Sequence, residues 1–440
     1  MTSTEQAPSV AFVTLGCAKN EVDTSRMRER LARAGFALQD DPELADAVVV
    51  NTCCFIQSAT EESIDAVFEA AGLPNVEGGA PLIVAGCMPS RYGQDLEDEL
   101  TEARAFVPCS REDDIAAVVS EALGRRPRAL DEQALAALPF QPARAECAPF
   151  CAYVKISDGC DRFCSYCAIP YIRGRYRSFP YEDIRADVAG SVAAGVREID
   201  LIAQDTGRWG DDLPEPSNLA NLATRLAEEF PDTWFRIMYI QPEGITDELL
   251  EAVAGHDNLC SYFDIPLQHV DADLLRAMNR RGSREAFEQL VERVRGRVPG
   301  AALRTTLIAG FPGETDEQFE ELCDFVGEGL FDYVGVFAYS REEGTRAAGL
   351  PGQIDEEEKA DRAQRLRDLA DGVSAARIAA RVGESLEVLV EGAEEDGQLF
   401  GRAQCQAPEV DGVTYLEAGE PGEIRRVRIV DTLLYEMEGE

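Results

Sequence analysis

Three cysteines stand close together near the middle of the chain, separated first by three residues and then by two. They are Cys160, Cys164 and Cys167, in the segment Ser157-Asp-Gly-Cys-Asp-Arg-Phe-Cys-Ser-Tyr-Cys-Ala. A closed zinc or iron-sulfur site normally uses four protein ligands, whereas a 4Fe-4S cluster held by three thiolates leaves one iron open to a further ligand. The spacing therefore favours a reactive iron-sulfur cluster over a zinc loop or a set of buried thiols.

A second group of three cysteines is spread through the first part of the chain. Short apolar runs alternate there with helical patterns, which is typical of a parallel sheet, and three of the runs end in Cys17, Cys53 and Cys87. The carboxyl ends of parallel strands lie along one edge of the sheet, so we expect these thiols to converge. Cys54 directly follows Cys53, and successive strand side chains point to opposite faces of a sheet. Only one of the two cysteines should therefore face the site, and this rule alone does not say which one.

The repeating patterns divide the chain into three domains and a linker. Residues 1–123 predict an α/β domain with a doubly wound parallel sheet, and residues 124–149, rich in Ala, Pro and Arg, predict a linker. In residues 150–380 six apolar runs alternate with amphipathic stretches, which predicts a partial (β/α)6 barrel with its active site at the strands' carboxyl ends. Short strand-like runs in residues 381–440 predict a small β-barrel.

The cysteine count and the charge limit the environment and the partners. Thirteen cysteines spread over 440 residues, with no secretory signal and no long apolar stretch, indicate a reduced, cytoplasmic protein without a membrane segment. The net charge of −40 would repel a phosphate backbone, so direct binding of nucleic acid is disfavoured and a basic protein partner fits better. The alternative is that the acidity only maintains solubility.

Several longer motifs resemble the methylthiotransferase family of radical S-adenosylmethionine enzymes, and the resemblance covers essentially the whole chain. The motifs are Leu15-Gly-Cys-Ala-Lys-Asn-Glu-Val-Asp, Asn51-Thr-Cys-Cys-Phe-Ile, Asp264-Ile-Pro-Leu-Gln-His, Gly310-Phe-Pro-Gly-Glu-Thr and Tyr339-Ser-Arg-Glu-Glu-Gly-Thr. They are most similar to the branch that modifies a ribosomal protein. Two positions depart from the family, because Cys54 stands where Gly is usual and Gln406 where Asp is usual.

The resemblance implies two 4Fe-4S clusters and S-adenosyl-L-methionine as cofactors. The cluster ligands it implies are Cys17, Cys53 and Cys87 for one cluster and Cys160, Cys164 and Cys167 for the other. The implied reaction is methylthiolation of the β-carbon of an aspartate in small-subunit ribosomal protein S-twelve. A 5′-deoxyadenosyl radical activates the C–H bond, and a second S-adenosylmethionine supplies the methyl group. A flavodoxin or ferredoxin is the implied electron donor.

Four further residues are candidates for cofactor or substrate contact. Tyr166 lies between two cluster cysteines, where the family has an aromatic residue near the adenine, although ordinary loop packing is an alternative. Gln204 and Asp205 close the second barrel strand and Arg304 lies on the fifth, where it is a candidate partner for the cofactor carboxylate.

Two rival functions remain at this stage. One is the same chemistry on an adenosine of transfer RNA, and the other is a non-catalytic iron-sulfur electron carrier or ribosome-binding module. The C-terminal domain resembles the TRAM domain, often an RNA-binding module. However, residues 381–440 contain fifteen acidic residues against five Arg and no Lys, which opposes phosphate binding. Electron carriers usually close their clusters with four cysteines, which weakens the second rival.

Overall fold

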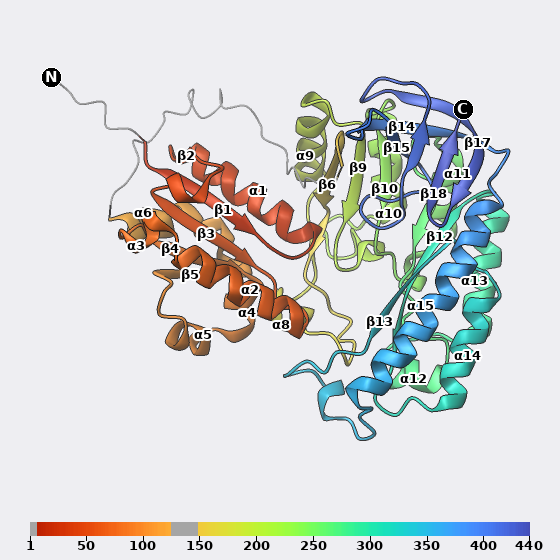
Figure 1. The fold of residues 1–440 in the computed structure, drawn as a ribbon, viewed down its shortest axis with the longest axis horizontal. Coiled ribbons are helices and arrows are strands. Elements are labelled where there is room, and N and C mark those ends of the chain that lie inside the picture. Colours follow the sequence, from red (N-terminus) through yellow and green to blue (C-terminus); the bar gives the residue numbers. More distant parts are fainter. Residues whose placement is uncertain (1–6, 125–147) are drawn as a thin grey trace. The chain divides into compact units, whose positions relative to one another are not determined.

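The computed structural model describes residues 7–124 and 148–440, which form two compact units (Figure 1). Within the described residues, the N-terminal unit comprises residues 7–124 together with two short segments, Gly159–Asp161 and Cys167–Tyr176. The barrel unit comprises residues 148–158, Arg162–Tyr166 and Arg177–Glu440. Part of the cysteine loop therefore groups with the N-terminal unit, although the sequence pattern assigned the whole loop to the barrel domain. The predicted linker falls almost entirely outside the described residues.

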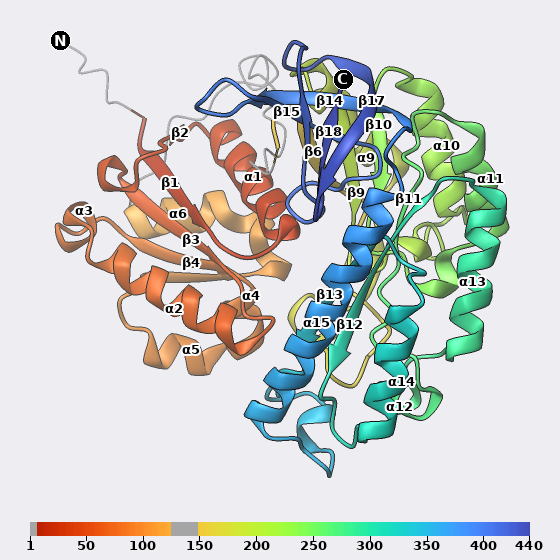
Figure 2. The same ribbon diagram turned by 45° about the vertical axis from the view of Figure 1, so that its right-hand side comes forward.

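The N-terminal unit is built on a five-stranded parallel sheet in the order β2-β1-β3-β4-β5. Figure 2 shows β1 to β4 of this sheet with α1 and α2 beside them. Successive valines of β3 point to opposite faces of the sheet: Val49 packs against α1 and α6, and Val48 and Val50 pack against α2. Helices therefore cover both faces, which confirms the predicted doubly wound sheet. The strands are β1 (Ser9–Thr14), β2 (Ala37–Leu38), β3 (Ala47–Thr52), β4 (Leu82–Gly86) and β5 (Ala105–Pro108). The helices are α1 (Ala18–Arg33), α2 (Gln57–Ala71), α3 (Pro74–Glu77), α4 (Cys87–Tyr92), α5 (Gln94–Glu99), α6 (Ile115–Leu123) and α8 (Ile169–Ile172).

The barrel unit contains six parallel strands that follow one another in sequence order. They form two three-stranded sheets, which are joined where Ile240 N donates to Asp264 O at 2.9 Å and where Phe235 bridges Leu259. This arrangement confirms the predicted partial (β/α)6 barrel. Its strands are β6 (Cys151–Lys155), β9 (Glu198–Ile202), β10 (Trp234–Ile237), β11 (Tyr262–Asp264), β12 (Ala302–Ala309) and β13 (Tyr333–Ala338). A two-residue pair, β7 (Ser157–Asp158) and β8 (Arg177–Ser178), flanks the cysteine loop.

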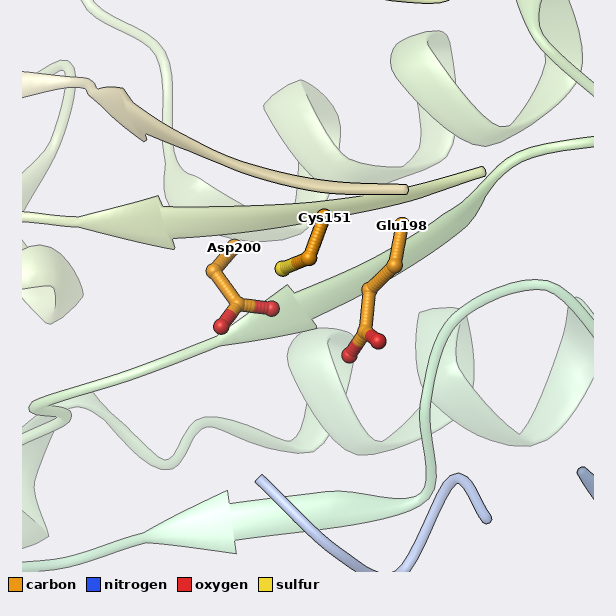
Figure 3. Close-up of side chains that lie close together, drawn as sticks. All are labelled: Cys151, Glu198 and Asp200. Carbon is orange, nitrogen blue, oxygen red and sulfur yellow. The ribbon is translucent and has the colours of Figure 1, made fainter. Parts of the chain in front are cut away.

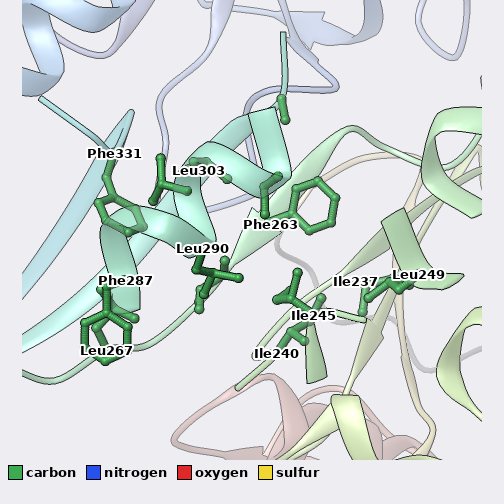
Figure 4. Close-up of a cluster of buried hydrophobic side chains, with 14 of the residues drawn as sticks. Ile237, Ile240, Ile245, Leu249, Phe263, Leu267, Phe287, Leu290, Leu303 and Phe331 are labelled. Carbon is green, nitrogen blue, oxygen red and sulfur yellow. The ribbon is translucent and has the colours of Figure 1, made fainter. Parts of the chain in front are cut away.

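Helices cover the outside of the barrel, and side-chain caps mark where several of them begin. Thr315 forms a reciprocal capping box with Gln318. The side chains of Asn218, Thr246 and Ser283 each accept from one backbone N–H in the first turn of another helix. Apolar residues of the helices and strands, including Phe263, pack into one core (Figure 4). The helices are α9 (Tyr181–Ala193), α10 (Leu219–Glu229), α11 (Asp247–Gly255), α12 (Ala272–Ala277), α13 (Arg284–Arg297), α14 (Asp316–Gly327) and α15 (Glu356–Ala379).

The C-terminal residues form a closed five-stranded barrel in the order β14-β15-β16-β18-β17, which confirms the predicted small β-barrel. The sequence pattern indicated four of these strands. The fifth, β18, was missed because only Met437 and Gly439 in it are buried, which leaves a weak apolar signal. The strands are β14 (Ser385–Ala393), β15 (Leu399–Ala403), β16 (Thr414–Leu416), β17 (Ile424–Leu433) and β18 (Glu436–Gly439). Across the described ranges, no helix combines the length and apolar character that a bilayer crossing requires.

Candidate metal centres and active site

The three N-terminal cysteines lie at the carboxyl ends of the central strands of the first sheet. Cys17 precedes α1 just after β1, Cys53 directly follows β3, and Cys87 is the first residue of α4 after β4. The strand order reverses between β1 and β3, which is the place where open α/β sheets bind ligands. The topology therefore puts these cysteines at the expected binding edge.

Asn20 and Gly16 bring the three thiols together. The buried Asn20 Oδ1 lies 3.8 Å from Cys17 Sγ and 3.9 Å from Cys87 Sγ, while Asn20 Nδ2 donates to Thr52 O at 2.9 Å. At Gly16, which has a φ of +104°, an added Cβ would stand 2.7 Å from Cys53 Cβ and 3.1 Å from Cys53 Sγ. Only glycine lets the turn that carries Cys17 approach Cys53 this closely. The predicted convergence of Cys17, Cys53 and Cys87 is therefore present in the structure.

Cys53 and Cys54 have different surroundings. The Ser63 hydroxyl accepts from Cys53 N at 3.0 Å and donates to Cys53 O at 2.7 Å, which fixes this turn of the backbone. Cys54 is fully buried in an apolar cluster with Met88 and Ile172, and burial raises the pKa of its thiol to about 12. The cluster around Cys54 also includes Cys87, so it is the close approach of Gly16, in the turn that carries Cys17, that favours Cys53 as the residue that faces the site.

Two residues that the sequence patterns did not single out touch Cys87. Arg173, which directly follows α8, lies with its Nη2 3.7 Å from Cys87 Sγ. Cys109, which follows β5, contacts the same thiol, and the hydrogen bond to Cys87 together with burial raises the pKa of Cys109. Neither position belongs to a motif in the sequence, and long-range packing alone places them here.

The cysteine loop of the barrel domain is held by several backbone contacts. At Gly159, with a φ of +75°, an added Cβ would stand 2.2 Å from Arg175 O, so this turn requires glycine. Asn279 Nδ2 donates to the carbonyls of Arg162 and Phe163, at 2.9 and 3.1 Å. Phe163 itself has a φ of +48°, a strained conformation that is typical of functional loops.

Arg280 and Tyr166 lie near Cys164 within the barrel unit. Arg280 Nη1 lies 3.9 Å from Cys164 Sγ, and Tyr166 packs against the barrel core. The core contact is consistent with loop packing for Tyr166, and its contact with the adenine stays a prediction. Cys160 and Cys167 group with the N-terminal unit and Cys164 with the barrel unit, so the convergence of these three thiols rests on their spacing in sequence.

Polar side chains gather at the carboxyl ends of β9 and β10. Gln204 Oε1 and Gln241 Oε1 are both buried, and neither accepts a hydrogen bond. Asp205 Oδ2 accepts from Arg162 Nε at 2.5 Å, while its Oδ1 accepts none; burial raises the pKa of Asp205, and Arg162 opposes that rise. Buried acceptors without partners are uncommon in folded proteins, so these oxygens are candidates for hydrogen bonds from a polar ligand or an ordered water. Gln241 belongs to this set, although the sequence patterns did not identify it.

Arg304, the remaining candidate for cofactor contact, lies between two carboxylates. It lies near the amino end of β12, where Nη1 contacts Asp264 Oδ1 at 3.2 Å and Nε lies 3.6 Å from Asp411 Oδ1 of the C-terminal barrel. Both carboxylates are buried, and Asp264 also accepts from Tyr239 N at 3.1 Å just beyond the end of β10. Arg304 thus links β12 to the C-terminal barrel, and its pairing with the cofactor carboxylate stays a prediction.

A third group of possible metal ligands lies at the amino ends of β6 and β9. Cys151, Glu198 and Asp200 point toward one another, and among the described residues this is the group whose ligand atoms all lie within 4.8 Å (Figure 3). Arginines already occupy it, however, because Arg236 Nη2 lies 2.7 Å and Arg402 Nη2 2.6 Å from Glu198. Burial alone would raise the pKa of Glu198, but these two arginines lower it to about 2. The group is an ion-pair network that joins the barrel to β15.

Arg402→Ala is expected to lower the free energy of unfolding by roughly 3–5 kcal/mol, because it leaves Glu198 and Glu391 buried with less compensation. Urea unfolding at pH 7 measures this. The matched control is Arg365→Ala, which removes an exposed pair with Glu320 and should cost less than about 1 kcal/mol. Equal losses in the two variants would contradict the structural role of the network.

The pH dependence of the same network has a definite sign. Since the folded-state pKa of Glu198 is lowered, its stabilising contribution is fully present above the unfolded value of about 4.3 and is lost as the pH falls toward 2. The difference in stability between the parent protein and Glu198→Gln should therefore shrink over that acidic range.

Comparisons with known proteins cover every part of the chain. Residues 9–108 match the uncharacterized protein family UPF0004, residues 154–326 the radical SAM superfamily and residues 382–440 the TRAM domain. Proteins named ribosomal protein uS12 methylthiotransferase RimO are similar over almost the full length. The one from Geobacter sulfurreducens is 41% identical, covering 98% of each chain, and the one from Syntrophus aciditrophicus is 42% identical, covering 96% of each.

Solved structures support the fold at low sequence identity. The radical S-adenosylmethionine methyltransferase TsrM from Kitasatospora setae, solved with cobalamin and a [4Fe-4S] cluster, matches with a TM-score of 0.58 and 16% identity over 78% of this chain and 74% of its own. The cobalamin-dependent S-adenosylmethionine radical enzyme OxsB matches with a TM-score of 0.52 and 12% identity over 83% of this chain and 56% of its own.

Proposed function

Because the chain belongs to the ribosomal protein uS12 methylthiotransferase family, we propose that it attaches a methylthio group to the β-carbon of an aspartate side chain of that ribosomal protein. The observation that carries this proposal is the convergence of Cys17, Cys53 and Cys87 at one sheet edge, in a chain that also carries the C-x3-C-x2-C loop. The β C–H bond of an aspartate is too weakly acidic for a protein base to deprotonate, so the reaction requires radical chemistry.

The donor sets fit two 4Fe-4S clusters and S-adenosylmethionine. Each cysteine trio supplies three thiols, which is the number that leaves one iron open. When bound, the clusters and S-adenosylmethionine supply the radical hydrogen abstraction, the transferred sulfur and the methyl group.

The protein's own side chains orient these groups and exclude water. Asn279 holds the loop that bears Cys164, and Arg280 places a positive charge beside that thiol. The unpartnered amide oxygens of Gln204 and Gln241 support a role in accepting hydrogen bonds from the cofactor, and Asp205 anchors the loop through Arg162. Fixing polar groups before the reaction removes the cost of reorganising them during it.

The charge distribution supports a basic protein substrate. The chain has a net charge of −40. In the C-terminal barrel Arg402 pairs with Glu198 inside the protein and the nearby Arg381 pairs with Asp332, so two of the five C-terminal arginines are unavailable to an RNA phosphate. This arrangement opposes the transfer RNA alternative, and the relatives bear the ribosomal protein name. A pure electron carrier would need neither the long barrel nor open clusters.

We further propose that a flavodoxin or ferredoxin supplies the electrons and that the enzyme works in the cytoplasm. All cysteines in the described ranges are free thiols, as in a reducing compartment.

The test is a reaction of anaerobically reconstituted protein with S-adenosylmethionine, a reductant and ribosomal protein uS12. We expect mass spectrometry to find one methylthio group on an aspartate of the substrate. A parallel reaction with transfer RNA serves as the control. Modification of the transfer RNA, with none on the protein, would reverse the assignment.

A further inference from the structure

Arg173 reaches the N-terminal thiol site from the segment that follows the cysteine loop of the barrel domain. Its Nη1 lies 2.7 Å from Asp23 Oδ2, and its Nη2 lies 3.0 Å from Asn20 Oδ1 and 3.7 Å from Cys87 Sγ. The side chains of Arg173 and Asp23 are each only 2% exposed. All of these residues belong to the N-terminal unit, so the contacts lie within one compact body.

Packing on both sides fixes the position of this guanidinium. Ile172 of α8, the residue before Arg173, packs with Met88 of α4, and α4 begins with Cys87. Asp23 lies on α1, the helix that Cys17 precedes. Arg173 therefore connects the two helices whose first turns carry two of the proposed cluster ligands.

The two terminal nitrogens of the Arg173 guanidinium have different partners, and one of them lies beside the Cys87 sulfur. Asp23 neutralises the guanidinium through Nη1, while Nη2 is directed at the amide oxygen and the thiol that border the site. A cluster held by three thiolates is anionic, and hydrogen bonds to its sulfurs are among the features that set its reduction potential. Charge-assisted hydrogen bonds of this kind are roughly twice as strong as neutral ones.

We propose that Arg173 is a positioning residue of the N-terminal cluster, which holds Cys87 in its ligand orientation and raises the cluster's reduction potential by donating to the Cys87 sulfur. This inference rests on the proposed function, since it requires a cluster on Cys17, Cys53 and Cys87. It assigns to the segment Cys167–Tyr176 two tasks, because the segment supplies a ligand to one cluster and a cation to the other.

The experiment uses the full-length chain in which Cys160, Cys164 and Cys167 are all alanine, so that iron at the N-terminal site is measured alone. Arg173→Gln, Arg173→Lys and Asp23→Asn are made in this background. The control is Arg28→Gln, which removes an ion pair with Asp40 on the exposed side of α1. Iron content, the thermal unfolding midpoint and the reduction potential from an electron paramagnetic resonance titration are measured for each.

We expect about four irons in the background protein. In Arg173→Gln the reduction potential should fall by at least about 59 mV, which corresponds to a tenfold change in the one-electron reduction equilibrium. Asp23→Asn should move the potential in the opposite direction, because it removes the carboxylate that neutralises the guanidinium. Arg173→Lys should restore part of the shift, and Arg28→Gln should match the background.

The possible failures are distinguishable. Absence of iron from the background protein would overturn the proposed function at this site. A full iron content with an unchanged potential in Arg173→Gln would overturn only the inference about Arg173. If Arg173→Gln loses iron, recovery in Arg173→Lys at an unchanged unfolding midpoint supports the electrostatic role. Loss of iron in both variants with a lowered midpoint overturns it in favour of simple packing.

Discussion

Cys164→Ala is expected to abolish formation of 5′-deoxyadenosine from S-adenosylmethionine, down to the uncatalysed background. Two thiols cannot keep a 4Fe-4S cluster in a three-thiolate loop, and the cofactor is cleaved only at an iron that the loop holds. Arg280, 3.9 Å from Cys164 Sγ, would then face no thiolate and would lose its charge partner in the loop. Chromatography of anaerobic reactions with dithionite measures the product.

The control for this substitution is Cys323→Ala, which removes a buried thiol of α14 from the barrel core. It should form 5′-deoxyadenosine at the parental rate. In parallel, the iron content of Cys164→Ala should fall from about eight to about four per chain, since the N-terminal trio is untouched. Parental production of 5′-deoxyadenosine by Cys164→Ala would remove Cys164 from the set of ligands.

Cys53→Ala is expected to separate the two halves of the reaction. It removes a thiol that stands against Gly16 in the N-terminal site, so sulfur insertion into the ribosomal protein should fall to background. Cleavage of S-adenosylmethionine should persist, because the substitution lies outside the C-x3-C-x2-C loop. Methylthiolated substrate, measured by mass spectrometry, and 5′-deoxyadenosine, measured by chromatography, must be followed in the same reaction.

The matched control for Cys53→Ala is Cys54→Ala, which removes the same thiol group from the neighbouring residue. Cys54 packs among apolar side chains, so this variant should retain most of the methylthiolation activity. Equal methylthiolation by Cys53→Ala and the parent, or a complete loss in Cys54→Ala alone, would show that the wrong thiol of the pair had been chosen.

The sequence patterns were most informative where local periodicity determines structure. Apolar runs placed Cys17, Cys53 and Cys87 at the ends of parallel strands, and parallel topology brought those ends to one edge. Gln241 resembles Gln204 in following a barrel strand. It lies four residues beyond the end of β10, whereas Gln204 lies two residues beyond the end of β9, so a comparison of equivalent positions would not have found it.

Long-range packing explains what the patterns did not predict. Arg173 reaches Cys87 because α8 docks on α4, and no local feature of the sequence encodes that contact. Arg304 was predicted to pair with the cofactor carboxylate because it is a cation on the fifth barrel strand. Local patterns did not predict that it also lies 3.6 Å from Asp411, which is more than a hundred residues away in sequence and belongs to a separate domain.

The two cysteine trios differ in how much of the chain must fold before their thiols lie close together. Cys160, Cys164 and Cys167 lie within one short loop, so a newly synthesised polypeptide already presents them side by side. Cys17, Cys53 and Cys87 meet only after β1, β3 and β4 have paired and Gly16 has closed on Cys53. If the sheet-edge trio holds a cluster as proposed, its iron uptake requires the folded N-terminal sheet, whereas the loop trio needs only a short stretch of chain.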